Sequence, residues 1–448
     1  MASEFPPATS VIESEPPEGW KATSLGGVAD VRFSSVDKLT HPSEPAVRLC
    51  NYMDVYNYDY ITGDLDFMRA SASQAEIDRF GIQAGDVLIT KDSETPNDIG
   101  ISAVVDNSLV NLVCGYHLGL IRPNQSEVDP TFLAKQLGHQ RITSYFGRQA
   151  NGLTRYALPL ASVRGIPLWL PERKEEQRAV GTVLRMVDDA ITKSEVVVAG
   201  LKQVRTGLLH DLLTCGLDEN GRLRDPFARP EQFRDWSIGR IPREWEVKTC
   251  DALCHQIVVG IVVKPAQYYV DKGVAALRSA NVRENYINFE DLVYISHESN
   301  RVLGKSALRT DDLVTVRTGY PGTTSVIPEC LDGSNCVDLI ISRPKADIKP
   351  EFLSLWVNSP FGKDQILRVQ GGLAQQYFNV GEMKRLLVAR PDIDEQVRIL
   401  AAVRRMEAVI QSEKTVHSKL ALLKLGLMSD LLSGHVRVPE SAFPESFQ

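Results

Sequence analysis

The residues with the greatest capacity for chemistry are Cys250, Cys254 and His255, which lie close together in the sequence. Thiolates and imidazoles are preferred ligands of zinc, but structural zinc sites usually combine two such pairs. A second pair at a suitable spacing is missing. The sequence therefore predicts cysteines with structural roles and no metal site.

Catalytic motifs are also missing. An amino-methyltransferase would show an Asn/Asp-Pro-Pro-Tyr/Phe tetrapeptide and a Gly-rich cofactor loop, and neither is present. Gly304-Lys305-Ser306 resembles the end of a nucleotide-binding loop, but Ser299 stands where that loop needs its first glycine. Glu172-Arg173-Lys174 has the end of a nuclease pattern without the upstream carboxylate. We therefore expect a chain that is not an enzyme.

The composition is that of an ordinary globular protein. The 448 residues are 43% apolar and 24% charged, with a net charge of −7, and this length suits several domains of about 100–200 residues each. Apolar stretches are too short for a membrane span, and the N-terminus lacks the features of a secretory signal. Scattered cysteines are typical of reduced thiols. We therefore expect a cytoplasmic protein that makes no contact with a membrane.

The two halves of the chain repeat each other. Asp86-Val87-Leu88 returns as Asp312-Leu313-Val314 at an offset of 226, and Gly207–Leu213 returns as Gly426–Leu432 at an offset of 219. The offset varies in the first part of each half but is constant from Glu176 to Leu213. One inserted residue would rotate a helix face by about 100°. The constant segment is therefore predicted to be one uninterrupted helix in each half.

Apolar residues in both constant segments recur at alternating spacings of four and three, which is typical of a helix that packs along a narrow seam. Polar residues interrupt both seams at the same register, Ser194 with Glu413 and Arg205 with Lys424. We predict that the two helices pair over about 55–60 Å. The alternative, that each helix packs on its own domain, stays open. The predicted interface residues are Leu184, Val187, Ile191, Leu201, Leu208, Val403, Met406, Ile410, Leu420 and Leu427.

The globular parts have a mixed α/β pattern. Strand-like runs are predicted at 84–90 and 311–317, and amphipathic helices at 130–142 and 350–367. The expected segments are a disordered tail at 1–16, a first domain at 17–171, a helix at 172–215, a linker at 216–241, a second domain at 242–391, a helix at 392–433 and a C-terminal tail at 434–448.

This duplicated order resembles that of the specificity subunits of type I restriction–modification systems. The resemblance is carried by Leu170–Gln177 before the first helix, Asp211–Gly216 at its end and Ile238–Trp245 before the second domain. It covers the chain from Pro17 to Ser433. The resemblance implies two tandem target recognition domains, each followed by a long helix, with the two helices paired as an antiparallel, coiled-coil-like spacer.

The resemblance also implies a function in phage defence. Each target recognition domain of such a subunit reads one half of a bipartite, asymmetric site in double-stranded DNA. The helices dock two modification subunits, which transfer methyl groups from S-adenosylmethionine to adenine. Restriction and translocase subunits, which use ATP and Mg, complete the complex. The specificity subunit itself would bind no cofactor.

Candidate DNA contacts lie in polar segments at equivalent places in the two halves. Glycine allows close backbone approach, and Arg, Gln or Asn can bond a base edge in bidentate fashion. Ordinary surface turns are the alternative interpretation. One pair of segments supplies Asn151, Gly152, Thr154 and Arg155 with Gly371, Gly372, Gln375, Gln376 and Tyr377; the second supplies Lys91 with Arg317; the third supplies Arg48 and Asn51 with Arg278 and Asn281.

A scaffold protein that only joins partners through its helices is the main competing hypothesis. The helical seam does not separate the two, because both kinds of protein would have it. The paired loops that contain Gly, Arg and Gln favour the DNA reader, whereas a chain without such loops would favour the scaffold.

Overall fold

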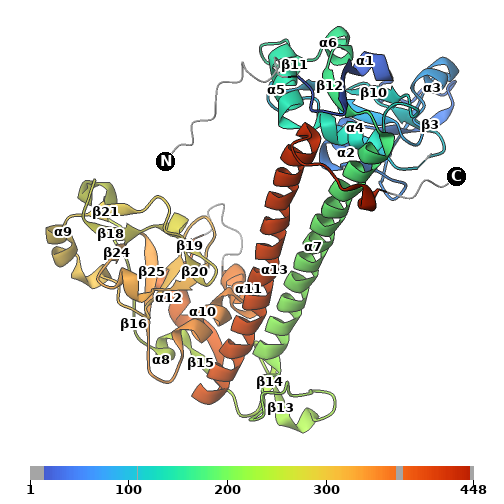
Figure 1. Cartoon of the computed structure of the whole chain (residues 1–448). Coiled ribbons are helices and arrows are strands. Elements are labelled where there is room, and N and C mark those ends of the chain that lie inside the picture. The colour runs from blue at the N-terminus through green and yellow to red at the C-terminus, as the bar shows by residue number, and fades with distance from the viewer. Residues whose placement is uncertain (1–14, 108, 370–376, 444–448) are drawn as a thin grey trace. The chain divides into compact units, whose positions relative to one another are not determined.

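The computed structural model describes residues 15–107, 109–369 and 377–443 (Figure 1). The tail expected at 1–16 therefore lies outside the described residues except for its last two positions. The chain forms two compact units: unit 1 comprises 1–196 and 415–448, and unit 2 comprises 197–414. Each unit thus contains one globular domain and a part of both long helices. Every helix in the described ranges is too short or too polar to span a lipid bilayer.

Unit 1 is built on a five-stranded sheet with the strand order β2-β10-β6-β8-β4. A three-stranded sheet, β5-β3-β9, packs beside it, and Phe132 and Phe146 are fully buried in the core. The strands are β1 (Trp20–Ser24), β2 (Ala29–Phe33), β3 (Ala46–Cys50), β4 (Tyr60–Ile61), β5 (Met68–Ser71), β6 (Val87–Thr90), β7 (Asp92–Ser93), β8 (Ser102–Val105), β9 (Leu112–Cys114), β10 (Leu118–Pro123), β11 (Tyr156–Ala157) and β12 (Pro167–Pro171). The short helices are α1 (Leu25–Val28), α2 (Tyr52–Asn57), α3 (Gln74–Phe80), α4 (Pro130–Leu137), α5 (Gln140–Gln149) and α6 (Leu160–Arg164).

Unit 2 repeats this plan with the strand order β16-β25-β22-β23, and a second four-stranded sheet has the order β17-β21-β18-β24. Its strands are β13 (Phe233–Trp236), β14 (Gly239–Pro242), β15 (Glu246–Thr249), β16 (Cys254–Val259), β17 (Tyr269–Val270), β18 (Val274–Leu277), β19 (Val282–Arg283), β20 (Tyr286–Ile287), β21 (Val293–Ile295), β22 (Leu313–Val316), β23 (Thr324–Val326), β24 (Asn335–Cys336), β25 (Leu339–Pro344) and β26 (Leu387–Arg390). Its short helices are α8 (Cys250–Leu253), α9 (His297–Val302), α10 (Pro350–Asn358), α11 (Pro360–Val369) and α12 (Val380–Arg385).

The helices predicted at 130–142 and 350–367 are each two helices in the structure. The first breaks at Gly138, and His139 caps the new helix α5 by accepting a hydrogen bond from the Arg141 amide at 3.3 Å. The second breaks before Pro360, because proline has no amide hydrogen to continue the helical ladder. The amphipathic period continues through both breaks, which is why periodicity alone predicted single helices.

The prediction of two long, uninterrupted helices is confirmed. Helices α7 (Lys174–Thr214) and α13 (Ile393–Ser433) each have 41 residues, and Figure 1 shows them in green and red. Over 194–208 and 410–427 the predicted seam positions are buried or half-buried, whereas most other positions are exposed.

Ion pairs join the two helices within each unit. In unit 1, Asp188 bonds Lys424 at 2.7 Å, and Glu195 lies 3.9 Å from His417. In unit 2, Arg205 bonds Glu407 at 2.9 Å. Seven residues forward on α7 correspond to seven residues backward on α13, so the contacts in unit 1 run antiparallel. Coiled-coil pairing along the whole length stays a prediction.

A buried Glu-Gln pair anchors the start of each long helix. Glu395 is 2% exposed, and its carboxylate accepts hydrogen bonds from Arg224 at 2.5 Å, from the Trp245 indole at 3.0 Å and from the Leu217 amide at 2.8 Å. Gln396 accepts a bond from the Lys349 amide at 2.7 Å. The chain that leaves the end of α7 is thereby tied to the beginning of α13.

Unit 1 has the equivalent anchor. Glu176 binds Arg437, which follows the end of α13, and Gln177 accepts a bond from the Asp129 amide at 2.9 Å. Arg437 also donates to the Glu18 carbonyl at 2.8 Å. The C-terminal segment therefore packs on unit 1 in the way that the segment after α7 packs on unit 2.

Unit 1 contains a further charge cluster, of which the described residues of unit 2 retain only the Arg205–Glu407 pair at the matching register. Buried Lys135 on α4 pairs with Asp188 at 2.6 Å and with Asp59 at 2.8 Å, and Lys424 bonds the same two carboxylates. Burial opposes ionisation of Asp59, but the two lysines lower its pKa to about 2. By the repeat, Leu355 stands in unit 2 where unit 1 has Lys135.

Replacement of Glu395 by alanine should unfold unit 2 selectively. The change leaves Arg224 buried without its carboxylate, and breaking a buried ion pair costs about 3–5 kcal/mol. Hydrogen exchange of the β15 and β26 amides during a denaturant series measures this loss. Glu244→Ala is the matched control, because Glu244 bonds the same arginine from a side chain that is 79% exposed; it should cost less than about 1 kcal/mol. Equal losses for the two variants would contradict the anchor.

Unit 1 should lose stability as the pH falls from about 6.5 to 4. Burial and the nearby Arg141 lower the pKa of His139 to about 4, so over this range the unfolded chain binds a proton that the folded chain does not. The free energy of unfolding should fall by up to about 1.4 kcal/mol per pH unit. Denaturant unfolding at several pH values tests this slope, which His139→Asn should reduce while it retains a capping side chain. An unchanged slope in that variant would rule out His139 as the cause.

Candidate nucleic-acid interface

Two of the three predicted segments meet at one end of the main sheet in unit 1. The turn after β6 and the loop before β11 join through an antiparallel bridge between Ser93 and Tyr156. Arg155 donates to the Asp92 carboxylate at 3.0 Å, and His117 contacts the same carboxylate at 2.9 Å. Asp92 raises the pKa of Arg155 through this hydrogen bond. The carboxylate therefore holds the arginine above the end of the sheet.

A cavity of about 740 Å³ opens beside this cluster. Tyr52 and Tyr56 stack with their ring centroids 5.6 Å apart, and the Tyr56 hydroxyl donates to Asp98 at 3.0 Å. The lining residues are Tyr52, Met53, Tyr56, Asp92, Ser93, Glu94, Thr95, Asp98, His117, Thr154 and Arg155. Aromatic faces, carboxylate acceptors and one arginine are groups that suit contact with base edges rather than with phosphates alone.

The loop that carries Arg155 depends on Gly152. Its φ of +151° is unfavourable for other residues, and a Cβ there would lie 2.0 Å from the Arg155 carbonyl oxygen. Asn151 closes the loop by exchanging backbone hydrogen bonds with Ala157. Leu153 at the tip is 95% exposed. The loop thus presents an apolar tip and an arginine on a constrained backbone.

Other predicted contacts of unit 1 have structural partners. Lys91 donates to the Ser34 carbonyl at 3.0 Å between the rings of Phe33 and Tyr116, and burial lowers its pKa. Arg48 donates to the Val110 carbonyl at 2.7 Å. Asn51 is the N-cap of α2, which carries the stacked tyrosines. Arg48 and Asn51 therefore shape the site's surroundings, and neither lines the cavity.

Unit 2 has Arg317, which is only 7% exposed, at the position that Lys91 occupies in unit 1. It pairs with Asp338, lies over the Tyr377 ring at 4.5 Å from the centroid and accepts a backbone bond from Phe378 at 2.9 Å. A bridge between Thr318 and Tyr377 joins the same two segments as in unit 1. Gly371, Gly372, Gln375 and Gln376 lie outside the described residues.

The third predicted pair does not reach this site in unit 2. Asn281 is fully buried, and its amide donates to the carbonyls of Asn288 at 3.2 Å and Glu290 at 2.8 Å, so the prediction that it contacts DNA is wrong. Arg278 donates to the Asp291 carbonyl at 2.6 Å. Both residues close the turn around β19 and β20. The spacing of Arg and Asn along the sequence is the same for this structural role as for a DNA contact, so the sequence alone does not separate the two.

His117 and Asp338 are not among the contacts predicted from the sequence. Each stands one residue before the central strand β10 or β25, and the repeat relates them at an offset of 221. Each pairs with a residue of the preceding turn, His117 with Asp92 and Asp338 with Arg317. A comparison of the residue types just before the repeated strands could have indicated them.

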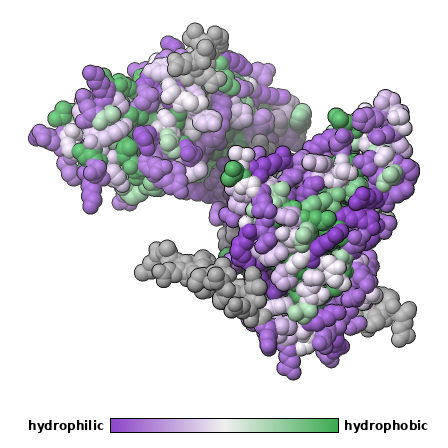
Figure 2. Space-filling view, turned by 90° about the horizontal axis from the view of Figure 1, so that it is seen from above, coloured by the Kyte–Doolittle hydropathy of each residue, from purple (hydrophilic) through white to green (hydrophobic). Residues whose placement is uncertain are grey.

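The described residues contain no cluster of three or more His, Cys, Asp or Glu side chains placed to hold a metal ion. Cys250 and Cys254 are both buried, with their sulfur atoms 3.9 Å apart. On the faces seen in Figure 2, hydrophilic residues cover most of the surface of both units, and apolar residues form smaller groups among them.

No profile of a known protein family matches the chain. Curated relatives do match it over nearly its full length. The chain is 20% identical over 437 residues to the type I restriction enzyme MjaVIII specificity subunit of Methanocaldococcus jannaschii, covering 95% of each chain. It is 23% identical over 428 residues to the EcoKI specificity subunit of Escherichia coli K12, covering 90% of this chain and 86% of that one.

Solved structures share the fold. A chain from a structure of the complex assembly and conformational transition of the type I R-M system aligns with a TM-score of 0.62 at 16% identity, covering 94% of this chain and 100% of that one. The type I S subunit from M. genitalium aligns with a TM-score of 0.50 at 13% identity, covering 94% and 98%. Over nearly its whole length, the chain is therefore similar in sequence and in fold to the specificity subunits of type I restriction–modification systems, the family that its sequence resembles.

Proposed function

We propose that this chain reads a bipartite, asymmetric site in double-stranded DNA for a type I restriction–modification complex, with one half-site read by each unit. The observation that carries the proposal is the repeated arrangement at the end of the two main sheets. In each unit, a turn and a later loop bridge to each other beside an arginine held by a carboxylate. In unit 1 this is Arg155 of the loop with Asp92 of the turn, and in unit 2 it is Arg317 of the turn with Asp338 before β25. Such an arrangement preorganises side chains for contact with base edges.

The two half-sites should differ in sequence, because the two sites differ in chemistry. Unit 1 surrounds Arg155 with Asp92, Glu94 and Asp98, whose carboxylates suit the amino groups of cytosine or adenine. Unit 2 stacks Arg317 on Tyr377 and presents Tyr320, which is 83% exposed. Arginine and aromatic side chains suit contacts with guanine and thymine better than contacts with cytosine or adenine. Catalysis belongs to partner subunits, which would hold S-adenosylmethionine, ATP and Mg.

Two copies of a modification subunit should dock on the long helices. Exposed apolar residues recur at the same register of both helices: Val197 with Val416 and Val204 with Leu423, each pair at an offset of 219. Their exposed fractions lie between 44% and 56%. A repeated apolar surface on two equivalent elements suits two copies of one partner. Restriction and translocase subunits would join the assembly through those partners.

Arg155→Ala should relax recognition of one half-site only. Loss of a bidentate base contact costs about 1–3 kcal/mol, or roughly 5- to 150-fold in discrimination at one position. The readout is the methylome of cells that express the chain with its modification subunit, and the affected half of the motif should become degenerate at one base pair. Arg155 has a side chain that is 61% exposed, so the fold should persist.

Tyr320→Ala is the matched control in unit 2. It should alter the other half of the motif and leave the Arg155 half intact. An unchanged bipartite motif in both variants, despite normal complex formation, would favour the scaffold hypothesis and contradict DNA reading by these loops.

Val204→Asp and Leu423→Asp should each remove one modification subunit. A buried unpaired carboxylate disfavours an apolar contact strongly, so native mass spectrometry of the complex should show one partner copy lost per variant and both lost in the double variant. Lys202→Asp, on the same exposed stretch of α7, is a control for charge. Full occupancy in the double variant would place the docking surface elsewhere.

A further inference from the structure

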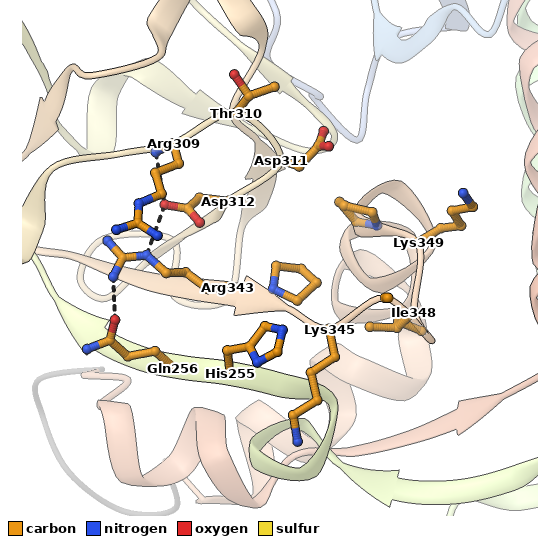
Figure 3. Close-up of a pocket in the computed structure, with 13 residues that line it drawn as sticks. His255, Gln256, Arg309, Thr310, Asp311, Asp312, Arg343, Lys345, Ile348 and Lys349 are labelled. Carbon is orange, nitrogen blue, oxygen red and sulfur yellow. Dashed lines mark hydrogen bonds and ion pairs between the residues drawn. The ribbon is translucent and has the colours of Figure 1, made fainter.

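A second cavity, of about 760 Å³, lies in unit 2 where β22 begins and β25 ends (Figure 3). This is the opposite end of the sheet from Arg317, because Arg317 follows β22. Four strand residues at about 3.3 Å each separate the two ends by roughly 13 Å. The lining residues are His255, Gln256, Arg309, Thr310, Asp311, Asp312, Arg343, Pro344, Lys345, Ala346, Ile348, Lys349 and Pro350.

Arg343 forms the fixed floor of this cavity. Its guanidinium donates to Asp312 at 3.3 Å, to the Ala307 carbonyl at 2.9 Å and to the Gln256 amide oxygen. A guanidinium has five N–H donors, so two N–H groups of Arg343 remain free after these three hydrogen bonds. Asp312 also accepts the Arg309 amide at 3.0 Å, which closes the turn before β22.

Arg309 supplies a second guanidinium that the protein leaves without a partner. Within the described ranges, no hydrogen bond or ion pair involves its side chain, and the residue is exposed. Figure 3 shows the Arg309 and Arg343 guanidinium groups next to each other beside the single carboxylate of Asp312. Burial raises the pKa of Asp312 although both arginines favour its charged form. The single carboxylate of Asp312 therefore lies beside two guanidinium groups, which leaves a local excess of positive charge.

The lining as a whole is cationic. Arg309, Arg343, Lys345 and Lys349 oppose Asp311 and Asp312, so the cavity carries a formal excess of two positive charges with His255 neutral. This excess matches a phosphate monoester, whose charge is about −1.5 to −2 at pH 7. A carboxylate or a phosphodiester carries one negative charge and would neutralise only half of the excess positive charge of the cavity.

The hollow of unit 1 at the end of β10 lacks this property. Arg122 there makes two bonds of 2.8 Å to Asp86, and Arg164 donates to the Val31 carbonyl at 2.9 Å. Gln83 stands at the position of Arg309, since its amide donates to Asp86 as the Arg309 amide donates to Asp312. The unpartnered guanidinium therefore belongs to unit 2 and is not needed for the fold that the two units share.

We infer that this cavity of unit 2 is a binding site for a phosphate monoester group, held between the Arg309 and Arg343 guanidinium groups. Arg309 can donate in bidentate fashion, the two free N–H groups of Arg343 complete the cradle, and Lys349 lies at its rim. The site is independent of the DNA contacts at the other end of the sheet. Both a nucleoside monophosphate and free inorganic phosphate offer the required group.

Isothermal titration of the full-length chain with adenosine monophosphate and with inorganic phosphate, at constant ionic strength in chloride, tests the inference. We expect one site per chain and a loss of about 10-fold or more in affinity in Arg309→Gln, the effect of losing one charge-assisted pair. Tighter binding of adenosine monophosphate indicates a nucleotide, and equal binding indicates free phosphate. Affinity for the nucleotide should fall below pH 6 as the phosphate loses its second charge.

Lys305→Gln is the matched control, because it removes an exposed cation from the same surface outside the cavity. It should leave both titrations unchanged. Equal weakening by the two variants would overturn the inference, since it would indicate general charge attraction. Absence of binding to both anions would also overturn the inference. So would a lower salt dependence of DNA binding in Arg309→Gln, because it would show that Arg309 contacts the DNA backbone.

Discussion

The buried carboxylate at the start of each long helix is the interaction on which the rest of the structure depends. Glu395 accepts bonds from Arg224, Trp245 and Leu217. Glu176 binds Arg437, whereas the indole of Trp20, the counterpart of Trp245, is buried without a hydrogen-bond partner. A buried ionised group is stable only when it is paired and hydrogen-bonded. Each carboxylate therefore requires the end of one helix, the start of the other and the adjoining domain to be in place together. This requirement makes each unit one cooperative body.

The two units use this common frame differently. Unit 1 adds Lys135, which ties its domain to Asp188 of α7 and shares Asp59 with Lys424 of α13. Unit 2 has an apolar residue there, and only the partly exposed Arg205–Glu407 pair stands at the matching register. Exposed ion pairs contribute little, whereas buried ones are sensitive to the loss of any member. The domain of unit 1 is thus held by a denser set of charges.

The end of the main sheet combines rigidity with variable chemistry. The bridges between Ser93 and Tyr156 and between Thr318 and Tyr377 set the backbone of both sites alike. The side chains on that backbone differ, with carboxylates around Arg155 and the Tyr377 ring against Arg317. A fixed frame with exchangeable side chains allows one fold to recognise different base pairs, because base contacts depend on side-chain type and phosphate contacts on backbone placement.

The sequence by itself determined the repeat, the two long helices, their shielded seam and the resemblance to a known family. These features depend on periodicity and order, which survive without knowledge of contacts. It also indicated the turn and loop that meet at each sheet end. Only the tertiary structure decided which side chains face outward: Asn281 has the same spacing from Arg278 as Asn51 has from Arg48, yet its amide is consumed inside the fold. His117 and Asp338 find their partners through contacts between residues that are distant in the sequence. The helix breaks at Gly138 and Pro360 depend on local stereochemistry, which the amphipathic period does not reveal.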